Sequence, residues 1–116
     1  MVVQSNEPNM MRGLAEMNTE VVEALLGSQL ENLEQSKLGP REYAMVKIAG
    51  LVGIDASPTS YAWQVGFAKE SGVTDADILG ILVALSPTLG YARIVAAAGD
   101  LALALGFISE EGEHRE

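Results

Sequence analysis

The sequence predicts an all-α fold of five or six helices joined by short turns. Apolar residues recur at helical spacing along most of the chain, and Pro and Gly residues separate the periodic segments. No stretch shows the alternation or the β-branched enrichment that is typical of a strand. A chain of 116 residues fits one domain, and an aromatic content of only 5% predicts an aliphatic core.

The N-terminal part is expected to combine a flexible segment with one amphipathic helix. Residues 1–17 form the flexible segment, in which Pro8 could begin a short helix. Asn18 or Thr19 is expected to cap the next helix, which ends near Lys37 because a Gly-Pro pair follows. Four apolar residues of this helix share one stripe that is predicted to be buried: Val22, Leu26, Leu30 and Leu33.

The following helix is predicted to run from Pro40 to Val52. Glu42 lies in its first turn, where a carboxylate interacts favourably with the helix dipole. Two interpretations of Glu42 stay open. It shuttles protons at a pocket, or it only compensates the dipole and pairs with Arg41 or Lys47. The apolar stripe of the helix consists of Met45, Ile48, Ala49 and Val52.

A well-delimited helix is predicted between Ser57 and Gly72. Ser57 has the hydroxyl that an N-cap needs, and Pro58 follows at the first helical position, where its missing N–H costs nothing. Gly72 stands where a left-handed residue ends a helix. Capping is the first interpretation of Ser57, and a role in chemistry is the second.

The same helix carries the candidate ligand contacts. Ser60 and Gln64 are four residues apart and therefore share one face, where they either bind an oxygen of a ligand or lie at the surface. Tyr61 and Trp63 are the aromatic residues beside them, and we expect both to contact a substrate. An aromatic helix N-terminus with polar groups on one side is a plausible binding site.

Two apolar helices are predicted to follow. Thr74 is the expected N-cap of the first, and Asp77 three residues later imitates a capping box. The segment from Ile78 to Leu85 is apolar nearly all round, which predicts a subunit interface. Ser86 and Pro87 repeat the Ser-Pro pair of residues 57 and 58 and are expected to open the last helix.

The last helix is predicted to end at Gly106, before a charged tail at residues 108–116. Arg93 and Asp100 are its charged residues, and their spacing of seven places them on one face. Arg93 either binds a carboxylate of a ligand or pairs with an acid such as Asp100 across an interface. A buried charge needs a partner in either case.

Composition excludes several functions. The net charge of −9, from 16 acids and 7 bases, disfavours nucleic acid and anionic membranes as partners. The chain has no Cys, and its single histidine, His114, lies in the charged tail. Thiol chemistry, catalytic triads and most transition-metal sites are therefore not expected, and we predict no cofactor and no metal. With no signal peptide or membrane span evident, a cytoplasmic protein is expected.

Three segments together resemble a known family. Arg41-Glu42 opens a helix, Gly72-Val73-Thr74 joins two helices, and the run from Val83 to Ala98 reads VALSPTLGYARIVAAA. In this order they are similar to the carboxymuconolactone decarboxylase family, which includes the alkylhydroperoxidase D-like proteins. The resemblance covers residues 18–107, and the run from Val83 to Ala98 is its most specific part.

The resemblance implies an alkylhydroperoxidase D-like helical fold and a homo-oligomer, a trimer or a hexamer. The peroxidase branch of the family carries Cys-x-x-Cys-x-x-x-His, and these three positions fall on Ser57, Ser60 and Gln64 here. Thiol peroxidase activity is therefore not expected, because Ser cannot undergo thiol–disulfide exchange. Glu42 is the counterpart of the family's glutamate.

Two functions from different classes follow. The first is a cofactor-free lyase on a small lactone or carboxylate, with Glu42 as the proton-transfer group and Arg93 as the anion partner. In this interpretation Ser57, Ser60 and Gln64 complete the catalytic site, and Tyr61 could substitute for the missing histidine. The alternative is a non-catalytic protein on the same scaffold that binds a small ligand or serves in assembly.

Overall fold

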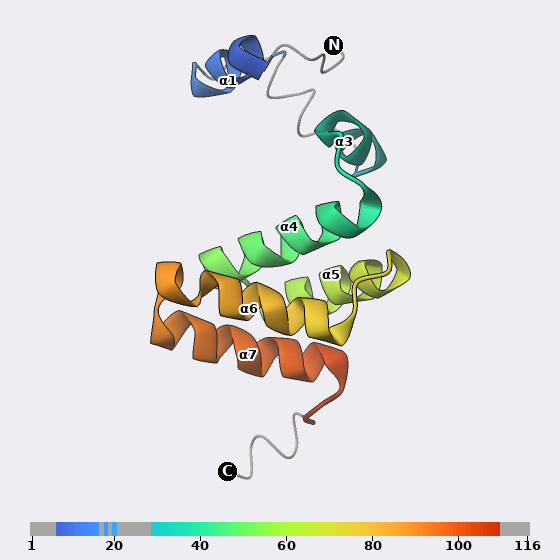
Figure 1. The fold of residues 1–116 in the computed structure, drawn as a ribbon, viewed down its shortest axis with the longest axis vertical. Coiled ribbons are helices and arrows are strands. Elements are labelled where there is room, and N and C mark those ends of the chain that lie inside the picture. Colours follow the sequence, from blue (N-terminus) through green and yellow to red (C-terminus); the bar gives the residue numbers. More distant parts are fainter. Residues whose placement is uncertain (1–6, 17, 19, 21–28, 110–116) are drawn as a thin grey trace. The chain divides into compact units, whose positions relative to one another are not determined.

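The structure of the protein is a computed structural model that describes residues 7–16, 18, 20 and 29–109 (Figure 1). In these ranges the chain forms six helices and no strand, which confirms the all-α prediction. Two compact units make up the chain, Met1–Tyr43 and Ala44–Glu116, here called the first and the second unit. Their boundary falls inside a helix.

The first unit contains two short helices, α1 (Glu7–Ala15) and α3 (Gln29–Ser36), and the beginning of α4 (Pro40–Ile54). The predicted end near Lys37 is confirmed, because this residue has a positive φ of 63° and follows α3. The buried Tyr43 hydroxyl donates to Asn32 Oδ1 at 2.6 Å and so ties α4 to α3 within this unit.

One prediction for the first unit is wrong. Leu30 was expected in a buried stripe, but 65% of its surface is exposed, and Leu33 is half-buried. Helical spacing identifies a shared face but not what covers it. The other two stripe residues, Val22 and Leu26, lie outside the described residues, as does Thr19, one of the two expected caps.

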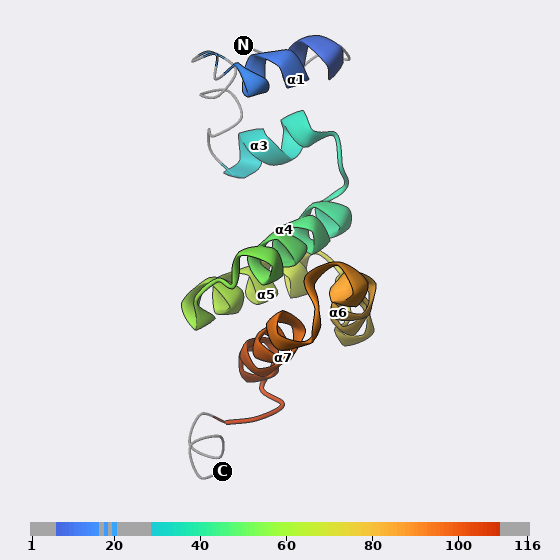
Figure 2. The ribbon, with the colours of Figure 1, turned by 90° about the vertical axis from the view of Figure 1, so that its left-hand side faces the viewer.

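The second unit contains most of α4 and the helices α5 (Pro58–Glu70), α6 (Asp75–Leu89) and α7 (Tyr91–Leu105). Both α5 and α6 pack against α7, and Figures 1 and 2 show α6 joined to α7 by a short turn. The core is aliphatic apart from one tyrosine, as the composition predicts. Its fully buried larger side chains are Ile48, Val52, Tyr61, Ile78 and Leu101.

Local capping sets the ends of α5 and α6. Thr74 Oγ1 accepts from the Asp77 backbone N–H at 3.0 Å, and Asp77 Oδ2 accepts from the Thr74 N–H at 2.9 Å. This reciprocal pair is the predicted capping box. Gly72, with a φ of 89°, lies just after α5 in the conformation that only glycine adopts without strain.

The predicted start of the last helix is wrong. Ser86 and Pro87 do not open α7, because both lie in the last turn of α6. The Ser86 hydroxyl donates to the Leu82 carbonyl at 2.8 Å instead of capping a new helix. The break between the two helices comes at Gly90, which has a φ of 85° and lies between the end of α6 and the start of α7.

The outer surface of α6 and α7 is apolar. Leu79 and Val83 are 61% and 64% exposed, and Tyr91 and Val95 of α7 are also exposed. From Ile78 to Gly99 the exposed residues include no charged side chain. In the part of the chain that the structure describes, no helix is long and apolar enough to cross a membrane.

Candidate functional site

Ser57 caps the helix that carries most of the candidate site. Its backbone is extended, with φ −72° and ψ 156°, and Pro58 is the first helical residue. Ser57 Oγ accepts from the Ser60 backbone N–H at 3.4 Å and lies 3.3 Å from Ser60 Oγ. The predicted capping role is confirmed, and the two serines contact each other at the start of α5.

Tyr61 occupies the centre of the second unit. Its side chain is completely buried, and its hydroxyl has no hydrogen-bond partner among the described residues. Burial raises the pKa of this hydroxyl, and the nearby carboxylates of Asp100 and Asp55 raise it further. The Arg93 guanidinium acts in the opposite direction and lowers the pKa. The hydroxyl therefore keeps its proton and remains available as a donor or an acceptor.

Arg93 reaches from α7 to the end of α4. One guanidinium nitrogen, Nη1, donates to the carbonyl of Gly53 at 2.5 Å. The last carbonyls of a helix lack partners within the helix and carry partial negative charge, which a cation compensates. Sequence reasoning expected an acid as the partner of Arg93, and this backbone carbonyl was not foreseen.

Gln64 follows Tyr61 by three residues, which places both on neighbouring positions of α5. Its Oε1 atom is buried, and no residue in the part of the chain that the structure describes is its hydrogen-bond partner. Ser60, on the preceding turn, is half-buried and shares the face of Gln64 as predicted. Trp63 is 76% exposed, because a residue two positions after Tyr61 points to almost the opposite side of a helix.

Glu42 lies in the first unit, in the first turn of α4. Its carboxylate is exposed and forms an ion pair with Arg41, at 3.2 Å between Oε2 and Nη1. This pair is one of the two local roles expected for Glu42. An exposed pair of this kind contributes little to stability, about 0–1 kcal/mol.

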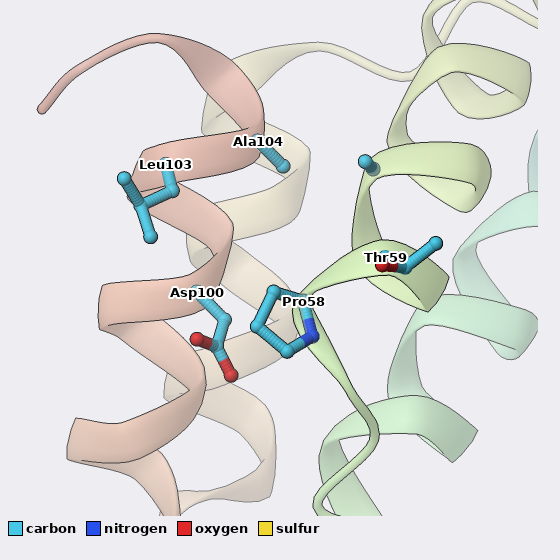
Figure 3. Close-up of a pocket in the computed structure, with 6 residues that line it drawn as sticks. Pro58, Thr59, Asp100, Leu103 and Ala104 are labelled. Carbon is cyan, nitrogen blue, oxygen red and sulfur yellow. The ribbon is translucent and has the colours of Figure 1, made fainter. Parts of the chain in front are cut away.

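A pocket of about 320 Å³ opens between the first turns of α5 and the C-terminal half of α7 (Figure 3). In the figure the Asp100 carboxylate projects from α7 toward Pro58. Among the described residues that line it, Asp100 is the charged one, and its carboxylate also raises the pKa of Tyr61. The pocket is lined by Pro58, Thr59, Ala62, Asp100, Leu103 and Ala104.

Sequence reasoning missed the roles of Thr59, Asp55 and Asp100 at this site. Asp100 had a usable signal, because it is the only acid in the apolar segment 91–105. Asp55 had a weaker signal. Asp is one of the few residues besides Gly that tolerate a positive φ, which marks it as a turn residue between two helices, and its φ is 56°. Within the described ranges, no group of three or more His, Asp or Glu side chains is arranged to hold a metal ion.

The second unit is thus a small all-α unit with buried polar atoms on α5 and a pocket between α5 and α7. Comparison with protein-family models, with curated proteins and with solved structures finds no match to this chain. Membership of the carboxymuconolactone decarboxylase family stays a prediction that rests on the residues of the three segments described above.

Proposed function

We propose that the protein is a non-catalytic small-ligand-binding protein on a carboxymuconolactone decarboxylase-like scaffold. The observation that supports this proposal is the completely buried Tyr61 hydroxyl, which has no hydrogen-bond partner among the residues that the structure describes. Tyr61 lies on α5, the helix whose Pro58, Thr59 and Ala62 help to line the pocket. Buried polar groups in native proteins are nearly always hydrogen-bonded, and leaving one unsatisfied costs about 1–3 kcal/mol. A ligand or a water molecule that reaches the hydroxyl would remove this cost.

Gln64 supports the same proposal. Its buried, unpartnered Oε1 gives α5 a second unsatisfied polar atom close to the first in sequence. Two such atoms on neighbouring positions of one helix are unusual, since a native domain has only a few. Ser57 favours binding over catalysis, because its hydroxyl contacts Ser60 and the helix backbone, whereas a nucleophilic serine needs an adjacent base.

A cofactor-free lyase on a small lactone or carboxylate is the second candidate. The observation that favours it is the action of Arg93 on Tyr61, which brings an anion partner near a group that can give a proton. In this function Tyr61 would serve as the proton donor. The predicted role of Glu42 is tested separately, by the turnover of Glu42→Gln.

A thermal-shift screen combined with turnover assays separates the two candidates. The compounds are small aromatic acids, lactones, alcohols and amines at millimolar concentration. Binding without chemistry predicts a concentration-dependent rise of Tm and an unchanged compound. Turnover of a lactone or carboxylate would establish the lyase instead. If no compound changed Tm or was consumed, both candidates would fail.

We also propose that the chain forms a homo-oligomer, a trimer or a hexamer, through α6 and α7. The supporting observation is the exposed and uncharged surface that includes Leu79, Val83, Tyr91 and Val95. Copies of a chain with net charge −9 repel one another, and an acid-free apolar face is where they approach at least cost. Light scattering should give a mass several times 12.3 kDa, and a monomer would contradict the proposal.

A cytoplasmic location stays part of the proposal. We also expect neither nucleic acid nor an anionic membrane as a partner, because the net charge of −9 disfavours both. Fractionation of the cells that produce the protein tests the location.

A further inference from the structure

A second pocket of the second unit lies between α6 and α7. It shares no described lining residue with the pocket between α5 and α7. Its lining comes from both helices and from Phe107, two positions after the end of α7. Apart from Asp75, every described residue that lines it is apolar. The pocket is therefore a separate place at which an apolar molecule can leave water.

The inner wall of this pocket belongs to the core. Ile78 and Leu82 of α6 and Leu101 of α7 line it, and all three are buried. The two helices also pack against each other. Side chains in a close-packed core keep their rotamers, so this wall exists before a ligand enters. A preformed wall lowers the entropy that binding costs.

Phe107 forms the outer side of the pocket. It lines the pocket, and 62% of its surface is exposed. The end of α7 fixes its backbone, because the Phe107 N–H donates to the Ala102 carbonyl at 2.8 Å and Gly106 has a φ of 79°. The turn thus holds an aromatic ring at the pocket while much of the ring stays in water. A ligand that covers the ring would gain free energy in proportion to the apolar area it removes from water.

Volume and charge select the ligand. The pocket has a volume of about 160 Å³. An apolar cavity of about 150 Å³ engineered into another protein takes up benzene, so one ring is the right scale. Asp75 forms an ion pair with Lys69 and lies in the first turn of α6, where the helix dipole favours a carboxylate. Its charge is therefore compensated within the protein, and a charged ligand would give up its hydration beside apolar walls.

We propose that this pocket binds a small uncharged compound with one aromatic ring, held between Phe107 and the aliphatic side chains of α6 and α7. The site is additional to the proposed function and does not depend on Tyr61 or Asp100. Aromatic rings prefer offset or edge-to-face contact with one another, so Phe107 favours an aromatic ligand over an aliphatic one. Toluene is a suitable probe because it has one ring and no charge.

The test titrates the full-length protein with toluene in sealed NMR tubes and follows the methyl signals of Ile78 and Leu101. Both signals should move and saturate. Benzoate and benzylamine share the ring and carry opposite charges, and each should bind here at least tenfold more weakly because its charge would lose hydration. Methyl signals that do not move with toluene, or binding of either charged compound as tight as that of toluene, would overturn the inference.

Two variants locate the binding. Ala102→Leu fills the pocket and should weaken toluene binding at least tenfold, whereas Ala96→Leu adds the same side chain at an exposed position of α7 outside the lining and should leave it unchanged. If Ala102→Leu does not fold, Phe107→Ala provides the test, because it changes an exposed residue and should weaken binding about threefold or more. Undiminished binding by whichever of these two variants folds, or an equal loss in Ala96→Leu, would overturn the inference.

Light scattering separates a ligand site from a contact between copies. Leu79 lines this pocket and also belongs to the exposed apolar surface of α6 and α7. The mass of the protein should be the same with and without saturating toluene. A mass that falls as toluene binds would show that a second copy occupies the pocket, and would overturn the inference. Failure of the proposed function would leave the toluene result unchanged, because Tyr61 and the methyl groups of Ile78 and Leu101 report on binding separately.

Discussion

Arg93 donates a hydrogen bond to the carbonyl of Gly53, forty positions earlier in the chain, and so fastens α7 to the last turn of α4. The same guanidinium lowers the pKa of Tyr61, against the effect of burial and of two carboxylates. One side chain therefore has a structural role at a helix end and an electrostatic role at the candidate site.

Replacing Arg93 should reveal the structural role first. Arg93→Met should lower the free energy of unfolding by about 1.5–3 kcal/mol, because a charged hydrogen bond is lost and the Gly53 carbonyl loses its donor. Urea unfolding measures the change. The matched control is Lys69→Met, which removes a surface cation paired with Asp75 and should cost at most about 1 kcal/mol. Equal effects of the two replacements would contradict this role of Arg93.

Replacement by alanine should have different effects on stability at Thr74, the N-cap of α6, and at Ser86, in the last turn of α6. Thr74→Ala removes the cap at the N-terminus of α6 and should cost about 1 kcal/mol. Ser86→Ala should change stability by less than about 0.5 kcal/mol, because this hydroxyl only bonds back to Leu82 within the helix. Denaturation midpoints of the two variants check the contrast. A cost of 1 kcal/mol or more for Ser86→Ala would mean that Ser86 starts a helix after all.

Removing the Tyr61 hydroxyl should make the ligand-free protein more stable. Tyr61→Phe keeps the buried ring and removes an unsatisfied polar group, so the free energy of unfolding should rise by about 1 kcal/mol. The control is Tyr91→Phe, because Tyr91 is exposed and its hydroxyl has water available. A loss of stability in Tyr61→Phe, with Tyr91→Phe unchanged, would show that the hydroxyl already has a partner.

Alkaline pH should destabilise the protein through the same hydroxyl. The pKa of Tyr61 in the folded state lies above the usual tyrosine value of about 10, so the folded protein holds this proton longer than the unfolded chain. Stability from this group is complete below about pH 10 and falls as the pH rises toward the folded-state pKa. Asp100→Asn should lower that pKa, as followed by tyrosinate absorbance, and Glu70→Gln should not. An unchanged titration in Asp100→Asn would remove Asp100 from the site.

Local chemistry made much of the helical framework predictable. Ser57, Thr74 with Asp77, and Gly72 act through hydrogen bonds or backbone angles within a few residues, and all three predictions are confirmed. Ser86 and Pro87 show the limit of this reasoning. The same Ser-Pro pair that caps α5 lies inside α6, because tertiary packing rather than the pair itself decides where a helix breaks.

The candidate site was predictable only in part, because it depends on contacts between distant segments. The helix that carries Ser60, Tyr61 and Gln64 could be chosen from the sequence. The position of Arg93 on the Gly53 carbonyl and the presence of Asp100 at the pocket depend on how α7 packs on α5 and approaches the end of α4. Trp63 was expected to contact a ligand, yet it is exposed on the side away from Tyr61.

The most direct test of the account is NMR of the full-length protein with ¹³C-labelled tyrosine rings, titrated with benzylamine and, in a parallel sample, with benzoate. Tyr61→Phe assigns the Tyr61 signal, and the exposed Tyr91 serves as the internal reference. If Tyr61 belongs to a small-ligand site, its signal should move and saturate with one of the two compounds while Tyr91 stays in place. A Tyr61 signal that moves with neither compound, or only in parallel with Tyr91, would contradict the account.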